Sequence, residues 1–297
     1  ILGMRLRQVC NESGLNHYMG IAISAFVATI IAWASTLLPA EWTSTPWHPL
    51  LACALFIVPG VPLINFVDDM LDNYIQVGIV RAVNTLLMVA AMAFGISFAV
   101  KLCHIENFFP TISMVPHHQY WEYAIAAAIS AMGFSMIFNI QRRLLWVVAI
   151  GGIIAVCTRN FVNLGPSTDN IGLDMGLVIG SFSGAVLVSL IAIKAVHWFH
   201  VPNHVLTIPS VIPMIPGVLM YRMRFGISNI NVQSIDQVTP LMKAIESGVN
   251  SGLVIMCIAL GVAIPNIFGR RFIASSKNKR LAELLKERKA RGKFVEW

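Results

Sequence analysis

The chain has 297 residues, of which 57% are hydrophobic and 12% are charged, and its mean hydropathy is +0.72. Soluble domains carry about 25% charged residues, so this composition excludes a soluble globular protein and indicates an integral membrane protein. The net charge of +7 arises from residues 266–297, which hold ten Lys or Arg and three Glu, so it does not indicate nucleic-acid binding.

Eight hydrophobic segments follow one another along the chain. Each is a candidate membrane span, since about 20 helical residues cross the hydrocarbon core of a bilayer. Together they predict an all-α polytopic helix bundle. The segments are residues 18–38, 49–67, 74–100, 123–140, 144–158, 175–193, 205–221 and 247–268.

The positions of Lys and Arg predict the orientation of these segments. The basic segment after residue 268 places the C-terminus in the cytoplasm, and eight crossings then place the N-terminus of this chain there too. Arg142 and Arg143 also fall inside, whereas Arg222 and Arg224 fall outside, against the rule. We therefore expect a multi-pass protein of the bacterial inner membrane with both termini of this chain in the cytoplasm.

Two segments, residues 56–66 (FIVPGVPLINF) and 211–221 (VIPMIPGVLMY), are interrupted by Pro-Gly and a second proline. Proline lacks a backbone N–H and clashes with the preceding turn, and glycine tolerates conformations that other residues avoid. Backbone groups freed in this way at membrane depth are tolerated only where they face protein or a wet cavity. The interrupting residues are Pro59, Gly60, Pro62, Pro213, Pro216 and Gly217.

Broken segments at matching places in two halves indicate the binding site of a transporter. Aligning Pro59 with Pro216 gives an offset of 157 residues, or five crossings, and an odd number of crossings reverses the orientation. This predicts an inverted-topology repeat, with residues 1–110 ending the first repeat and residues 121–268 forming the second. Half-helix termini suit the carboxylate and ammonium of an amino acid. A structural kink is the alternative, because membrane helices are rich in Pro and Gly.

The basic segment at residues 269–297 is predicted to be a cytoplasmic tail. Leu281, Leu284 and Leu285 share one face of a predicted helix in it. We favour a solvated helix because this apolar face is short, and attraction to anionic lipid headgroups is the alternative.

Charged residues follow the first broken segment. Carboxylates inside a membrane are costly and usually functional, so Asp69, together with Asp68, is the candidate proton carrier, and a solvated interfacial cluster is the alternative. Arg81 in the next helix can pair with one of these aspartates or hold a substrate carboxylate. Asn65 and Asn139 are candidate hydrogen-bond partners of a substrate.

Patterns for enzymes and metal sites are missing from the sequence. The chain contains no GxSxG, Walker A or HExxH pattern, and its five cysteines are scattered singly. We therefore expect no enzyme activity, no cofactor, no metal and no direct coupling to ATP. Glycines at positions 176, 180 and 184 predict close packing of one helix against another.

Three stretches resemble the threonine/serine exporter family. Residues 58–82 (VPGVPLINFVDDMLDNYIQVGIVRA) resemble the end of the family's first half, and residues 133–152 (GFSMIFNIQRRLLWVVAIGG) resemble the start of its second half. Residues 208–223 (IPSVIPMIPGVLMYRM) resemble its later signature. The matching positions are Pro59, Gly60, Pro62, Asn65, Asp69, Gly78, Arg81, Asn139, Arg143, Pro213, Pro216, Gly217 and Tyr221.

The resemblance implies ten membrane helices, in one chain or split over two proteins, after a cytoplasmic N-terminal domain. Eight segments here imply that this domain and the first two helices are absent. The family is associated with export of threonine and serine driven by the proton-motive force, and its two-chain relatives with succinate. The resemblance adds Tyr221 to the substrate-binding residues proposed above.

The predicted function is therefore proton-coupled export, by antiport, of small hydroxy amino acids such as threonine and serine. Export of a small dicarboxylate such as succinate is an alternative, and a non-transporting docking or signalling module is an alternative of another class. The predicted partners are a small-molecule substrate, protons and membrane lipid, without nucleic acid. The sequence leaves room for a homo-oligomer.

Overall fold

The structure is a computed structural model that describes residues 2–35, 60–103, 119–166, 171–199, 201–228 and 238–290. The regular secondary structure in these ranges is helical throughout, and five helices in them are long and apolar enough to cross a membrane. The predicted all-α polytopic membrane protein is thus confirmed. The five are His17–Ala34, Ile75–Leu102, Arg142–Asn163, Leu177–Val196 and Leu241–Gly269.

The described helices follow the predicted segments closely. The first part of the chain holds α1 (Leu2–Glu12), α2 (His17–Ala34), α4 (Gly60–Leu71) and α5 (Ile75–Leu102). The second part holds α6 (Tyr120–Ile137), η2 (Arg142–Leu144), α7 (Leu145–Asn163), α8 (Leu177–Phe199), α9 (Asn203–Val211), η3 (Ile212–Met214), α10 (Gly217–Ser228) and α11 (Val238–Ala290).

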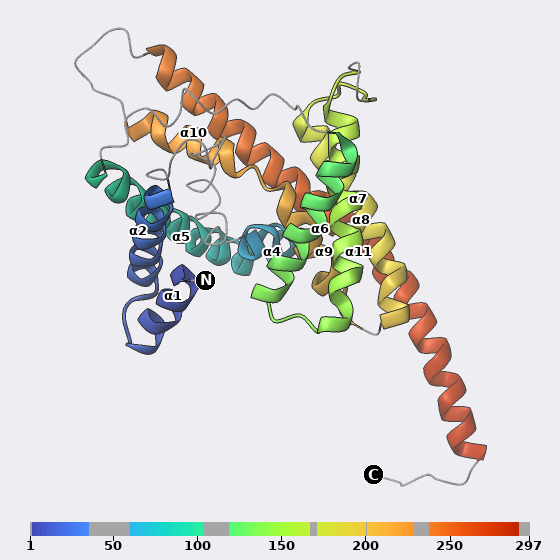
Figure 1. Cartoon of the computed structure of the whole chain (residues 1–297). Helices are drawn as coiled ribbons and strands as arrows, with labels where there is room; N and C mark the ends of the chain where they lie inside the picture. The colour runs from blue at the N-terminus through green and yellow to red at the C-terminus, as the bar shows by residue number, and fades with distance from the viewer. Residues whose placement is uncertain are drawn as a thin grey trace.

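The helices form two groups that meet at α4 (Figure 1). On one side α2 packs against α1 and α5, and on the other side α6, α7, α8 and α9 pack against one another. The long helix α11 crosses the molecule and contacts α8, α9, α10 and α4. Because α4 contacts both α5 and α11, it is the main element through which the two groups touch, and a smaller contact joins α10 to α5.

The second broken segment is interrupted as predicted. Helix α9 ends at Val211, a single 3-10 turn follows, and α10 begins only at Gly217. Ile215 lies between them in an extended conformation, with φ −61° and ψ 128°. The cause is Pro216, since the ring of a proline excludes the helical conformation from the residue before it.

The first broken segment is described only from Gly60 onward, where α4 begins. Pro62 lies in the first turn of that helix, where a backbone N–H has no intrahelical partner to lose. Pro59 and the apolar run before it lie outside the described residues, so the break on that side stays a prediction.

The last span does not stop at residue 268, the predicted end of the hydrophobic segment. Helix α11 has 53 residues and continues into the basic segment as far as Ala290. At 1.5 Å per residue it is about 80 Å long. Figure 1 shows it extending beyond the other helices at its C-terminal end. The helix predicted in the tail is therefore a continuation of the last span.

Glycines in α8 bring it against α7. A Cβ atom at Gly180 would lie 2.6 Å from the carbonyl oxygen of Arg159, and one at Gly184 would lie 2.6 Å from that of Ala155. The predicted close approach is confirmed at both positions. Gly176 differs, because it precedes α8 with a φ of +87° and has no neighbour within 4 Å.

We predict that Gly184→Ala destabilises the protein, because its methyl group would overlap the α7 backbone. Overpacking of this kind costs about 1–3 kcal/mol. Gly252→Ala in α11 is the matched control, since a Cβ there meets nothing within 4 Å. Thermal unfolding in detergent, followed by loss of the monodisperse peak in size exclusion, compares the two. Equal stability of the two variants would contradict the packing described here.

Candidate functional site

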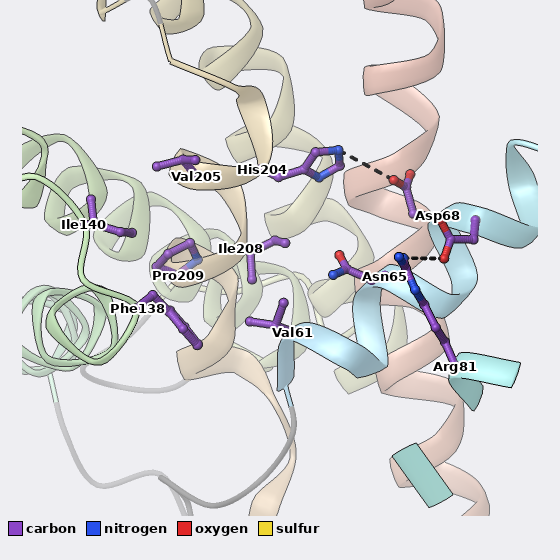
Figure 2. A pocket seen from close by; sticks show the side chains of 11 residues that line it. Val61, Asn65, Asp68, Arg81, Phe138, Ile140, His204, Val205, Ile208 and Pro209 are labelled. Atoms are coloured by element: carbon purple, nitrogen blue, oxygen red, sulfur yellow. Dashed lines mark hydrogen bonds and ion pairs between the residues drawn. The ribbon is translucent and has the colours of Figure 1, made fainter. Parts of the chain in front are cut away.

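A pocket of about 470 Å³ lies between α4, α5 and α9 and extends to the turn after α6 (Figure 2). Its volume is within the range of about 300–1,000 Å³ that is usual for small-molecule sites. Its wall is mostly apolar on the α9 side, apart from His204, and mostly polar on the α4 side, apart from Val61. The polar residues that line it are Asn65, Asp68, Asp69, Arg81 and His204, and apolar ones include Val61, Val205, Ile208 and Pro209.

Helix α4 meets the second broken segment at Gly60, the residue before Val61 of the pocket wall. A Cβ atom at Gly60 would lie 2.9 Å from Cδ1 of Ile215 and 3.5 Å from Cγ1 of Ile212. Ile64 of α4 also belongs to the buried cluster that contains Ile212 and Met214. The two segments singled out in the sequence are thus in direct contact. The contact itself is apolar, and the polar groups lie further along α4.

The turn between α4 and α5 places Arg81 beside Asp69. Asn73 adopts a φ of 68° in this turn, and Gly78 then allows close approach, since a Cβ there would lie 3.0 Å from the carbonyl oxygen of Phe66. Arg81 Nη1 donates to Asp69 Oδ2 over 2.5 Å (Figure 2). The side chains are 49% and 21% exposed. The ion pair, one of the two roles expected for Arg81, is therefore present and open to the pocket.

Asp68 faces a residue that sequence analysis did not single out. Its Oδ2 lies 3.6 Å from Nε2 of His204, which is the second residue of α9 (Figure 2). The Asp68 side chain is 12% exposed and that of Asp69 is 21% exposed, so the Asp68 carboxylate is buried more deeply, whereas the His204 side chain is 37% exposed. His204 and Asp68 are far apart in the sequence, and a single histidine among eight gives no signal of such a contact.

A second missed residue is Arg159, near the C-terminal end of α7. Its Nη1 donates to the carbonyl oxygen of Met214 over 3.4 Å, and its Nε and Nη2 donate to Oδ1 of Asn160. Met214 precedes the break, so the guanidinium supplies a donor to a carbonyl that the interrupted helix leaves without one. The sequence does contain a signal for this residue: Arg159 directly follows the apolar segment 144–158, and a charge in such a place is usually functional or structural.

The other predicted site residues lie around the pocket or outside the described part. Asn139 has a φ of 54° and is exposed in the turn that ends α6, where Ile140 N–H bonds to the carbonyl of Ser135. This is the left-handed residue that commonly ends a helix. Pro213, Pro216 and Gly217 form the break itself. Pro59 and the side chain of Tyr221 lie outside what is described.

The described ranges give no indication of a metal site. They contain no group of three or more His, Cys, Asp or Glu side chains that could hold a metal ion. The polar groups of the pocket instead form two facing pairs, Asp69 with Arg81 and Asp68 with His204. A carboxylate and a guanidinium side by side, as in the Asp69–Arg81 pair, suit a ligand that itself carries both signs.

Two family models match the chain. One, described as "Putative threonine/serine exporter", matches residues 1–103, and the other, "Threonine/Serine exporter, ThrE", matches residues 123–268. A protein of Klebsiella aerogenes named "Probable succinate transporter subunit YjjP" is 34% identical over 101 residues. These are 34% of this chain and 39% of that protein, so the match spans about two fifths of the relative's length. No solved structure matches.

We predict that Arg159→Gln lowers stability, because the carbonyl of Met214 loses a charged donor. Hydrogen bonds to charged groups contribute about 1.5–3 kcal/mol. Arg143→Gln is the control, since Arg143 is exposed and bonds only to Gln141 among the described residues. The midpoint of thermal unfolding in detergent is the measurement. A midpoint for Arg159→Gln that equals that of the control would show that the break does not depend on this donor.

Proposed function

Since this chain belongs to the threonine/serine exporter family, we propose that it is a proton-coupled secondary transporter that exports small hydroxy amino acids across the inner membrane. Membership of the family and the five candidate spans support a membrane transporter. The observation that supports the substrate class is the pocket beside the broken segment, in which an aspartate–arginine pair is open to a ligand.

The two charges of a zwitterion are complementary to those of Asp69 and Arg81. An amino acid can insert between Asp69 and Arg81, with its ammonium on the carboxylate and its carboxylate on the guanidinium, so that one ion pair becomes two. The guanidinium can hold a carboxylate through two parallel hydrogen bonds. Asn65 lines the same wall of the pocket and offers an amide to the substrate hydroxyl.

Proton coupling follows from competition at a carboxylate. An aspartate that is protonated has no charge to offer an ammonium, so one carboxylate holds either a proton or the substrate. This exclusion is what exchange of substrate against protons requires. Asp69 is the proposed proton carrier, with Asp68 beside it, and Arg81 is its partner when the pocket holds no substrate.

The halves of the chain are proposed to form an inverted repeat with both termini in the cytoplasm. In support, Gly60 at the start of α4 meets Ile212 and Ile215, while Asp68 further along α4 meets His204 at the start of α9. The two elements therefore pass each other in opposite directions. In this proposal Pro213, Pro216 and Gly217 shape the substrate path from the side of α10.

A dicarboxylate is the second candidate substrate, because the Klebsiella relative is named as a succinate transporter subunit. Two substrate carboxylates need two cations. The described residues that line the pocket supply Arg81 and, when protonated, His204, but they also supply Asp68 and Asp69. Repulsion from these two carboxylates favours the amino acid.

We predict that proteoliposomes containing the chain accumulate labelled serine and threonine when a pH gradient is imposed. Unlabelled threonine will compete with labelled serine, and succinate will compete poorly because of the two pocket carboxylates. Vesicles without protein are the control. Accumulation of succinate alone would replace the amino acid by the dicarboxylate, and the absence of all flux would favour a docking or signalling module.

We predict that Asp69→Asn abolishes flux driven by the pH gradient while the protein stays folded, because an amide does not titrate. Asp72→Asn is the control, since Asp72 follows the same helix but does not line the pocket. Uptake is measured at several external pH values, and folding is checked by size exclusion. A wild-type pH dependence in Asp69→Asn would remove Asp69 from the mechanism.

A further inference from the structure

The charges and the hydrocarbon of the pocket come from different places (Figure 2). The ion pair of Asp69 and Arg81 lies where α4 meets α5. The apolar side chains come from α9, from the turn after α6 and from the first turn of α4, and we call them the apolar wall. They are Val61, Phe138, Ile140, Val205, Ile208 and Pro209. A substrate whose charged groups bind the ion pair therefore has hydrocarbon beside the rest of the molecule.

The pairing of α4 with α9 fixes which residues lie level with one another. Asp68 meets His204 at one end of this pairing, and Gly60 meets Ile212 at the other. Residues 60 to 68 and residues 204 to 212 are steps of equal length, so the two segments run past each other in register. Ile208 lies midway along its own step, within the apolar wall.

In this register, Ile208 lies level with Ile64 and Asn65 of α4. Ile64 and Ile208 belong to the same buried cluster, which agrees with this placement. Four helical residues correspond to about 6 Å along α4, so Asn65 is one turn from Asp69. A substrate with its ammonium on Asp69 can thus place its side chain between Asn65 and the apolar wall. The pocket volume of about 470 Å³ leaves room for side chains longer than that of serine.

The pocket offers a substrate hydroxyl few partners. Besides the charged groups, the described lining residues with hydrogen-bonding side chains are Asn65 and His204. Nδ1 of His204 is buried, and Nε2 lies 3.3 Å from Nδ2 of Asn266 and 3.6 Å from Oδ2 of Asp68, so both ring nitrogens face protein groups. Asn65 is partly exposed, so water can replace a substrate hydroxyl on its amide. Loss of the hydroxyl therefore costs a ligand little.

The turn after α6 supplies part of the apolar wall through Asn139. This residue ends α6 with a φ of 54°, and the N–H of Ile140 bonds to the carbonyl of Ser135 over 3.0 Å. Phe138 and Ile140, on either side of Asn139, both line the pocket. Asn139 thus positions two apolar side chains at the pocket, which gives this turn a part in shaping the apolar wall.

We propose that the apolar wall binds the side chain of the substrate, and that amino acids with short apolar side chains, such as 2-aminobutyrate, norvaline and valine, are transported alongside threonine. The inference rests on the proposed function and deepens it, because it keeps the substrate charges at Asp69 and Arg81 and names the class of side chain. Valine and threonine have nearly the same shape, and a hydrophobic site discriminates weakly between such molecules. Serine lacks the methyl group of threonine and binds less tightly.

The first test uses ligands that differ by single groups. In proteoliposomes containing the full chain, unlabelled amino acids compete with the uptake of labelled threonine. Inhibition is expected to strengthen about two- to fourfold from alanine to 2-aminobutyrate and again to norvaline, because each step adds one methylene to the contact with the apolar wall. Labelled valine is expected to accumulate when a pH gradient is imposed. Equal inhibition by alanine, 2-aminobutyrate and norvaline would overturn the inference.

The second test changes the apolar wall itself. Val61→Thr and Val205→Thr keep the shape of the side chain and replace a methyl group by a hydroxyl, so both are expected to bring the inhibition ratio of 2-aminobutyrate to alanine closer to one. The two ligands are compared within one variant, so a loss of folded protein affects both equally. Val249→Thr in α11 is the matched control, since Val249 is 56% exposed and does not line the pocket. Wild-type ratios in both wall variants would refute the role of the wall.

The outcomes separate this inference from the proposed function. If serine and threonine inhibit uptake but alanine, 2-aminobutyrate and norvaline do not, the proposed function stands and the inference falls. If wild-type vesicles move no amino acid, the proposed function fails and binding decides on the inference. A bound ligand raises the midpoint of thermal unfolding of the purified chain, and norvaline is expected to raise it more than alanine at equal concentration. Equal midpoints with the two ligands would overturn the inference.

Discussion

A charged side chain inside a lipid bilayer must be matched by partners within the protein, because the hydrocarbon offers none. In this chain both carboxylates near the end of α4 lie beside a basic side chain of another helix. Asp69 is matched by Arg81 across the α4–α5 turn, and Asp68 by His204 across the α4–α9 contact. Helix α4 carries both carboxylates, so it must lie where α5, α9 and α11 all reach it, which is the place it occupies between the two groups of helices.

The same constraint applies to the backbone at the second broken segment. Pro216 ends the helical path, and the carbonyl of Met214 would then be left without a donor. Arg159 from α7 supplies that donor, while Ser210 of α9 donates to the carbonyls of Val148 and Leu206. Hydrogen bonds in both directions thus join α7 to the segment around the break. The carbonyl that the break exposes at Met214 takes its donor from a neighbouring helix.

Features that depend on a few consecutive residues could be predicted from the sequence. The break at Pro216 follows from the local geometry of proline, and the pairing of Asp69 with Arg81 needed only a short turn. The contact of His204 with Asp68 and Asn266 could not be predicted, because it joins three helices that are far apart in the sequence. Asn139 was predicted as a substrate ligand but is the residue that ends α6. An asparagine in a binding site and an asparagine that ends a helix cannot be told apart in a sequence.

The contact at Gly60 links the broken segment to the chemistry of the pocket. Gly60 lies against Ile212 and Ile215, and Val61, the next residue, already lines the pocket. A Cβ atom at position 60 would lie 2.9 Å from Cδ1 of Ile215, so a larger residue there would require the end of the Ile215 side chain to shift. The apolar contact at Gly60 and the polar residues that line the pocket belong to the same short helix. In the proposed transport cycle, a movement of α4 that separates this contact would therefore also change the pocket.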